Sequence, residues 1–328
     1  MEHLIDIVLL GLLMVTGLAI VRMRSLLAVA MLTSIYSLLS ASLFVVLDAV
    51  DVALTEAAIG AGISTILMLG TIALTSDIEQ APRHKPFLPL LVVVATGAAL
   101  IYGTLDMPHY GDPDAPVHRH LASTYLHDTA DDIGVQNVVT SVLASYRGYD
   151  TLGEVIVIFT AAVGVLSLLG YRTHQRNIQM PGARKMVVLR VITKLFFPLI
   201  LLFALYVLFH GDYGPGGGFQ AGVIFATGFI LYAMAYGLGN IQRIIPYRML
   251  ITMMAAGVLV YAGVGIDSLL LGGNFLQYSV LADNPVTGQL IGIMLIETGI
   301  GITVASVVLV IYYGFVSRQQ HEPNGACQ

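Results

Sequence analysis

Residues 187–237 read VVLRVITKLFFPLILLFALYVLFHGDYGPGGGFQAGVIFATGFILYAMAYG, and this stretch decides the fold class. Two long apolar runs, 187–209 and 219–238, are separated by a short segment rich in glycine. About twenty apolar residues in a helix are enough to cross the hydrocarbon core of a membrane. Each run therefore predicts a membrane-spanning helix, and the glycine-rich segment predicts a sharp connection between the two.

The composition of the whole chain agrees with a membrane protein. Of its 328 residues, 57% are hydrophobic and 11% are charged, whereas a soluble domain carries about 25% charge. Only helices or closed barrels satisfy the backbone in lipid, and long unbroken apolar runs differ from the alternating pattern of barrel strands. We expect an all-α, polytopic transmembrane protein with about nine spans. The predicted spans are 4–21, 26–47, 52–74, 87–105, 150–170, 187–209, 219–238, 248–271 and 288–316.

Polar segments divide the chain into parts. A long polar loop covers residues 106–136, a basic linker covers 171–186, and a polar tail covers 317–328. Segment 137–149 is apolar at first and polar at its end, which favours an amphipathic helix lying at the outer membrane surface. Lysine and arginine of the short connections gather on one side if the N-terminus is outside and the C-terminus is cytoplasmic. We therefore expect a multi-pass protein of the inner (plasma) membrane in that orientation.

Five ionisable residues lie within the apolar spans: Glu56, Glu154, Lys194, Asp267 and Glu297. A charge at the centre of a membrane helix costs roughly 2.5 to 3.5 kcal/mol. A chain that keeps several such residues must bury them against partners or use them. They are our first candidates for an ion or proton pathway.

Each of these residues also has a purely structural interpretation. Glu297 lies roughly 14 Å below the outer end of its span, where it could be a protonated hydrogen-bonding group or a relay. Lys194 could extend toward the cytoplasmic surface or pair with a buried carboxylate, and Glu56 could also reach the surface in part. Glu154 could stabilise a helix N-terminus, and Asp267 lies close to water.

The glycine-rich segment from His210 to Phe219 is the most distinctive local feature. It lacks the Gly-Lys-Ser/Thr ending of a phosphate-binding loop and follows no predicted strand, so nucleotide binding is not expected. One interpretation is a tight hairpin between antiparallel helices. The other is an irregular backbone element lining a polar cavity, with His210 and Asp212 as ligands or proton acceptors.

No cofactor or metal site is expected. The only cysteine, Cys327, lies in the polar tail, which argues against haem, iron–sulfur and zinc sites. Four histidines in the polar loop have loose spacing, so a solvated external loop is favoured over a metal site. These are His109, His118, His120 and His127.

The quoted stretch resembles MnhB, the second subunit of Mrp-type multisubunit Na+/H+ antiporters, which carries a similar Pro-Gly-Gly-Gly-Phe segment between two helices. Residues 48–64 (DAVDVALTEAAIGAGIS) resemble the MbhD domain of membrane-bound hydrogenases, and residues 137–170 resemble their MbhE domain. Both domains also form the C-terminal part of MnhA, the large Mrp subunit. The resemblance implies that the chain fuses the end of MnhA to MnhB.

The implied organisation has an MbhD-like domain with an extra span at 1–105, an MbhE-like domain at 137–170 and a four-helix MnhB-like domain at 187–316. The resemblance implies an accessory, non-enzymatic subunit of a multisubunit monovalent cation/proton antiporter. Its partners would be other antiporter-complex subunits, Na+ and H+, and the lipid bilayer, with no nucleic acid. Two alternatives stay open, a membrane-arm subunit of a redox-driven complex and a purely structural docking subunit.

Overall fold

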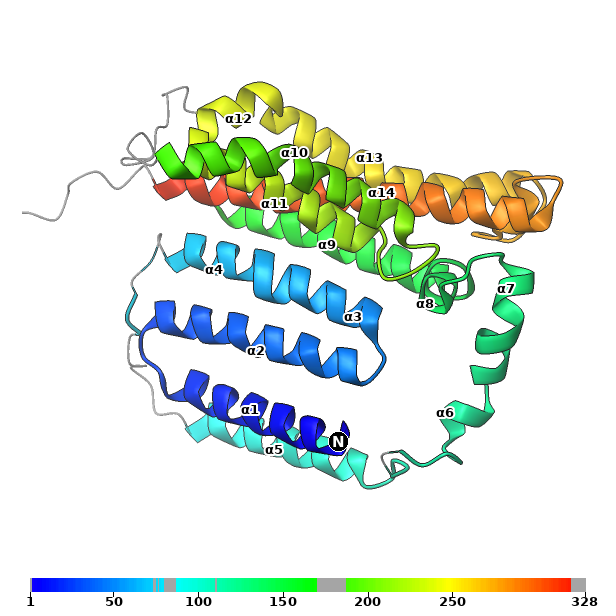
Figure 1. Ribbon diagram of the computed structural model, residues 1–328, viewed down its shortest axis with the longest axis horizontal. Helices are drawn as coiled ribbons and strands as arrows, with labels where there is room; N and C mark the ends of the chain where they lie inside the picture. Colours follow the sequence, from blue (N-terminus) through cyan, green and yellow to red (C-terminus); the bar gives the residue numbers. More distant parts are fainter. Residues whose placement is uncertain are drawn as a thin grey trace, which may run out of the picture.

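The computed structural model describes most of the chain as helix. The described residues are 2–72, 75, 77–79, 87–109, 111–169 and 187–319. Nine helical elements in these ranges are long and apolar enough to cross a membrane, which confirms the predicted all-α polytopic fold. They run roughly parallel to one another and alternate in direction (Figure 1). The predicted basic linker 171–186 and most of the predicted tail 317–328 lie outside the described residues.

The spanning elements are α1 (Glu2–Arg22), α2 (Leu26–Val46), a third span made of α3 (Val50–Thr55), η1 (Glu56–Ile63) and α4 (Ser64–Ile72), then α5 (Phe87–Thr104), α9 (Gly148–Leu169), α10 (Val187–His210), α11 (Gly218–Tyr236), α13 (Tyr247–Leu270) and α14 (Pro285–Gln319). Shorter elements lie in the connections: α6 (Pro116–Arg119), η2 (Thr124–Asp128), α7 (Thr129–Asp132), α8 (Val138–Ser141), η3 (Val142–Tyr146), α12 (Leu238–Ile244) and η5 (Tyr278–Val280).

The third span is not the single regular helix that its apolar pattern predicts. Its middle part, η1, is a π-helix, which has a wider turn and i→i+5 hydrogen bonds. Glu56 is the first residue of this wide stretch. The span packs against α2 on one side and α11 on the other, so the π-helix lies inside the bundle, where such stretches often mark functional sites.

The centre of the bundle is the contact between α11 and α14, the two most buried spans. A Cβ atom at Gly222 would lie 2.8 Å from the carbonyl oxygen of Gly301, and one at Gly218 would overlap the carbonyl oxygen of Glu297. Small residues of this kind let two helix backbones approach closely. The glycines of α11 therefore fix the position of the glycine-rich connection against α14.

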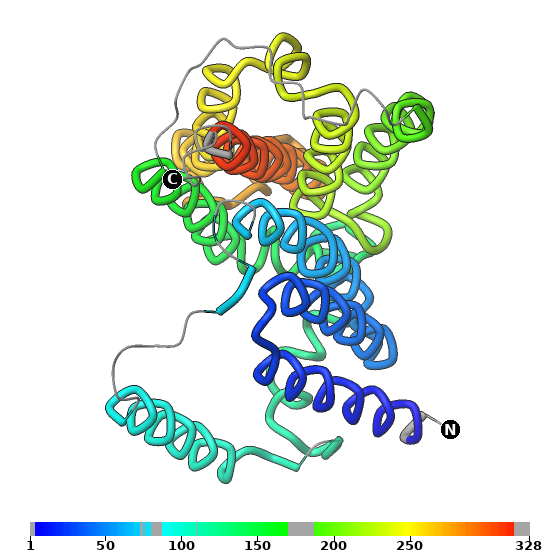
Figure 2. Tube along the Cα trace, turned by 90° about the vertical axis from the view of Figure 1, so that its left-hand side faces the viewer, coloured from blue at the N-terminus to red at the C-terminus, as the bar shows by residue number. Residues whose placement is uncertain are grey.

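The periphery is apolar and open. Leu13, with 9% exposure, is the one buried residue within the apolar windows of α1 and α5. α1 packs against α2, whereas α5 stands apart from the other spans (Figure 2). Both helices present apolar side chains outward, as expected for surfaces that face lipid or further helices.

Segment 137–149 differs from the predicted surface helix. It forms two short helical pieces, α8 and η3, that lead directly into α9. Thr140, Ser141 and Ala144 are buried, whereas Val139 and Leu143 are exposed. Thr140 is on the inner side because its hydroxyl donates to the Gly211 carbonyl oxygen of the glycine-rich connection, a contact that the apolar pattern does not reveal.

The close contact between α13 and α14 generates a stability prediction. A Cβ atom at Gly257 would overlap the Thr303 side chain and the Gly299 carbonyl oxygen. Overpacking of this kind costs about 1–3 kcal/mol, so Gly257→Ala should lower the Tm of the detergent-solubilised protein. The matched control is Gly263→Ala in the same helix, where nothing lies within 4 Å of the added Cβ. An equal Tm for the two variants would contradict the described packing.

Candidate functional site

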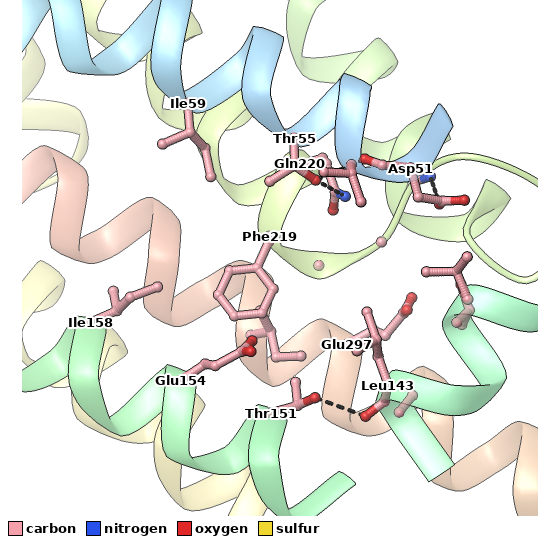
Figure 3. A pocket seen from close by; sticks show the side chains of 18 of the residues that line it. Asp51, Thr55, Ile59, Leu143, Thr151, Glu154, Ile158, Phe219, Gln220 and Glu297 are labelled. Atoms are coloured by element: carbon pink, nitrogen blue, oxygen red, sulfur yellow. Dashed lines mark hydrogen bonds between the residues drawn. The ribbon is translucent and has the colours of Figure 1, made fainter. Parts of the chain in front are cut away.

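A pocket of about 570 Å³ lies where three groups of helices meet (Figure 3). The third span contributes one wall, α8, η3 and α9 contribute a second, and the connection from α10 to α11 together with α14 contributes the third. Apolar side chains make up most of the lining. Three carboxylates lie on it, one from each group: Asp51, Glu154 and Glu297.

The connection between α10 and α11, residues 211–217, is here called the glycine loop. Gly217 has φ +118°, a conformation that side-chain-bearing residues rarely adopt. Its N–H donates to the Val207 carbonyl oxygen at 3.0 Å, which folds the loop back onto the end of α10. Gly216, Gly217 and Gly218 line the pocket. The loop is thus both a sharp connection and an irregular backbone wall, the two interpretations that its sequence allowed.

Asn137 connects the glycine loop to the start of α8. Its side-chain oxygen accepts hydrogen bonds from the N–H groups of Val139 and Thr140, as an N-cap does. Its side-chain amide donates to the Gly214 carbonyl oxygen at 2.9 Å and to Asp51 Oδ1 at 3.2 Å. One amide therefore joins all three walls of the pocket.

The third span is also hydrogen-bonded to α11 and to the loop. The Gly216 N–H donates to Asp51 Oδ1 at 3.3 Å. One turn further along the span, Thr55 Oγ1 accepts a hydrogen bond of 2.6 Å from the Gln220 side-chain amide. These contacts hold the Asp51 carboxylate at the rim of the pocket (Figure 3).

Glu297 is the most enclosed carboxylate of the pocket, with a relative exposure of 8%. The glycine loop leaves room for it, because Cβ atoms at Gly211 and Gly217 would lie 3.3 Å and 3.2 Å from its two carboxylate oxygens. Among the described residues it makes no side-chain hydrogen bond or ion pair. Asp51 and Asp212 are near enough for their negative charges to repel that of Glu297. The arrangement suits a group that binds and releases a cation or a proton.

Buried tyrosines hold the wall that carries Glu154. The Tyr261 hydroxyl donates to the Gly148 carbonyl oxygen at 2.7 Å, and the Tyr278 hydroxyl donates to the Ala144 carbonyl oxygen at 3.0 Å. Both rings are fully buried, and burial raises the pKa of Tyr278, so its hydroxyl keeps its proton. These two hydrogen bonds fix the position where η3 ends and α9 begins. They thereby help to orient α9 so that Glu154 lines the pocket.

Two further predicted site residues, Asp212 and His210, lie close to the pocket but are not part of its lining. Asp212 belongs to the glycine loop. His210 is the last residue of α10, and its ring stacks on Tyr206. Burial raises the pKa of the half-buried Asp212 carboxyl. Glu154 and Glu297 thus line the pocket, and Asp212 lies in the glycine loop, while their role in an ion pathway stays a prediction.

The remaining three predicted residues are not brought to the pocket. The Glu56 carboxylate lies near Gly60 of its own helix and Ser37 of α2. Lys194 is exposed on α10, and Asp267 is exposed near the end of α13. Among the described residues, neither of these two forms a salt bridge. A pathway role for these three residues stays a prediction that depends on surfaces outside the pocket.

The sequence prediction missed several polar residues of the site, among them Asp51, Thr55, Asn137 and Gln220. Asp51 looked like an ordinary loop acid at the start of a span, and Gln220 was hidden by its apolar neighbours. Asn137 before Val-Val-Thr carries the one usable signal, an N-cap pattern. In the described part of the chain, no three His, Cys, Asp or Glu residues are placed to hold a metal ion.

Fold and pocket together define a polytopic membrane protein with an acidic site at the junction of three helical groups. Known families match the same three groups in order. Residues 11–77 match MbhD and residues 88–185 match MbhE, two subunits of MBH, and residues 188–310 match the domain related to the MnhB subunit of the Na+/H+ antiporter. The MbhE match begins at α5 and therefore also includes the polar loop.

Two relatives and two solved structures are among the known proteins that resemble the chain. The putative antiporter subunit mnhB2 of Staphylococcus aureus is 37% identical over 128 residues, which are 38% of this chain and 90% of that protein. A protein of Rhizobium meliloti, named as a probable A/B subunit of a K+/H+ antiporter, is 28% identical over 281 residues, covering 75% of this chain. The chain spans only 27% of the length of that relative.

A structure of the Mrp complex from a Dietzia species aligns with 96% of this chain and 35% of its own, at a TM-score of 0.75 and 26% identity. The membrane-bound sulfane sulfur reductase, an archaeal respiratory membrane complex, aligns with 70% of this chain and 97% of its own, at a TM-score of 0.54 and 32% identity. The chain belongs to the Mrp-type antiporter subunits and joins MbhD, MbhE and MnhB domains in one polypeptide. The predicted family and the predicted class, a transporter subunit, are confirmed.

Asn137 offers a test of how the site is held together. Asn137→Ala removes the N-cap of α8 and the amide contacts to Gly214 and Asp51, at a cost of about 1–2 kcal/mol. Hydrogen exchange measured by mass spectrometry should become faster across residues 211–217. Asn284→Ala is the control, because it removes a similar contact to the Val286 N–H at an exposed position. Unchanged exchange in the glycine loop of Asn137→Ala would count against this bridge.

Asp212 gives a pH prediction. Its raised pKa means that the folded protein binds a proton more tightly than the unfolded chain. Its contribution to stability is therefore lost as pH rises from the ordinary pKa of 3.8 through the raised pKa. Asp212→Asn should gain Tm relative to the wild type as pH is raised through this window, whereas Asp283→Asn, at an exposed position, should not. A Tm difference that does not depend on pH would contradict the burial effect.

Proposed function

We propose that this chain is an accessory membrane subunit of a multisubunit monovalent cation/proton antiporter, and that its acidic pocket forms part of the ion or proton pathway. The observation that carries the proposal is the gathering of Asp51, Glu154 and Glu297 on one pocket that no lysine or arginine of the described chain lines. Carboxylates in a mostly apolar, partly enclosed site attract cations and protons. Membership of the antiporter subunits supports the same role.

The partners in this proposal are other membrane subunits of the complex, Na+ or K+, and H+. The exposed apolar faces of α1 and α5 are suited to contacts with such subunits or with lipid. The proposed location is the plasma membrane, with the N-terminus outside and the C-terminus in the cytoplasm. The glycine loop and the start of α14 then lie toward the outer side, since they are at the same end of the bundle as the N-terminus (Figure 1).

A second candidate is a membrane-arm subunit of a redox-driven complex. The similarity to the sulfane sulfur reductase complex favours it, and the acidic pocket could serve ion movement there as well. Proteins that co-purify with the chain distinguish the two: nickel or iron–sulfur proteins belong to the redox-driven complex, and small antiporter subunits belong to the first candidate.

Neutralising the pocket carboxylates tests the proposed function. In inverted vesicles that contain the assembled complex, Glu297→Gln should slow cation/proton exchange by roughly a hundredfold, the size of effect expected for a proton-transferring group. Asp51→Asn and Glu154→Gln should also slow it. Asp283→Asn, at an exposed position outside the pocket, should leave exchange unchanged. Wild-type exchange in all three pocket variants, with normal assembly, would exclude the pocket from the pathway and leave a docking role.

A further inference from the structure

Glu297 lies in the wall between two separate cavities. The first is the main pocket described above. The second is a small cleft of about 10 Å³ between α10 and α14, roughly the space that one water molecule needs. Its lining consists of Leu208, Phe209, Asp212, Met294, Glu297 and Thr298. Glu297 is the residue that both cavities share.

The two carboxylate oxygens of Glu297 face different glycines. Oε1 is the oxygen nearest to a Cβ placed on Gly217, which lines the main pocket. Oε2 is the oxygen nearest to a Cβ placed on Gly211, which directly precedes the cleft residue Asp212. Because these two positions carry no side chain, the two carboxylate oxygens lie beside two different glycines of the loop. Such a carboxylate can serve the main pocket with one oxygen and the cleft with the other.

Acidic groups surround this position. Asp51 and Asp212 act on Glu297 electrostatically, and Glu154 lines the same pocket. His210 lies at the end of α10, stacked on Tyr206, with its ring beside Gly214. In the described part of the chain, no lysine or arginine lines either cavity. No fixed positive charge on these linings therefore balances the charge of the Glu297 carboxylate.

We propose that Glu297 is the junction of a proton route that runs from the main pocket, through the cleft between α10 and α14, to the outer surface beside Asp212. The Glu297 carboxyl gives the proton on one oxygen to a water molecule in the cleft, which passes a proton to the Asp212 carboxylate. The other oxygen of Glu297 then takes the next proton from the main pocket. Each step exchanges one O–H bond for another. The inference rests on the proposed function and adds the outer opening of the route.

Cysteine labelling tests the opening of the cleft. Cys327 is the only cysteine of the chain, so Cys327→Ser provides a background in which the chain has no thiol. In that background, a charged, membrane-impermeant thiol reagent applied outside should label the Thr298→Cys variant of the assembled complex and slow its exchange at least fivefold. Thr303→Cys, fully buried on the same helix against α13, should stay unlabelled. Failure to label Thr298→Cys from outside, or labelling without effect on exchange, would overturn the proposed opening.

Asp212→Asn tests the acceptor beside the cleft. It should slow exchange at least fivefold, whereas Asp283→Asn should not. If Glu297→Gln abolishes exchange but Asp212→Asn and the labelled Thr298→Cys variant keep the wild-type rate, the outer opening is wrong and the proposed function stands. If Glu297→Gln itself exchanges at the wild-type rate, the junction is wrong. The Asp51 and Glu154 variants then decide the proposed function separately.

Discussion

The close approach of α11 to α14 is the constraint on which the rest of the site depends. Gly218 and Gly222 lie directly against the α14 backbone, and this contact sets the start of α11 level with Glu297. The glycine loop must then turn next to a buried carboxylate, which only a backbone without side chains allows. A larger residue at these positions would move α11 away from α14 and separate the loop from Glu297.

Hydrogen bonds to the glycine loop connect the three family domains. The loop belongs to the MnhB part, Asn137 to the MbhE part and Asp51 to the MbhD part. Because the loop is irregular, only some of its backbone groups bond back to α10. The Gly214 carbonyl oxygen and the Gly216 N–H bond instead to side chains of the other two parts, as buried backbone groups need partners. Thr140, which donates to the Gly211 carbonyl oxygen at 2.7 Å, has the same role. The same hydrogen bonds therefore satisfy the loop backbone and hold the walls of the pocket together.

The sequence was sufficient for the spans and for part of the site. Apolar runs predicted nine spans because the length of a membrane helix is set by the bilayer. The cost of burying charge identified Glu154 and Glu297, which the structure brings together. The same criterion could not separate these two residues from Lys194 and Asp267, since hydropathy along the chain does not say which side of a helix faces its neighbours.

The π-helix η1 was missed for a related reason, because its residues have the composition of an ordinary apolar helix. Polar partners were the hardest to predict, because Asn137 and Gln220 gain their role only through contacts with residues 86 and 165 positions away in the chain.

Covalent fusion of the three parts has a consequence for assembly. Each carboxylate of the pocket comes from a different part, and one polypeptide delivers all three in equal numbers from a single act of translation. Tethering also turns their docking into an intramolecular event, with effective concentrations on the order of millimolar for short connections. A pocket assembled in this way cannot lose one wall by subunit dissociation, and no excess of one part accumulates without the others.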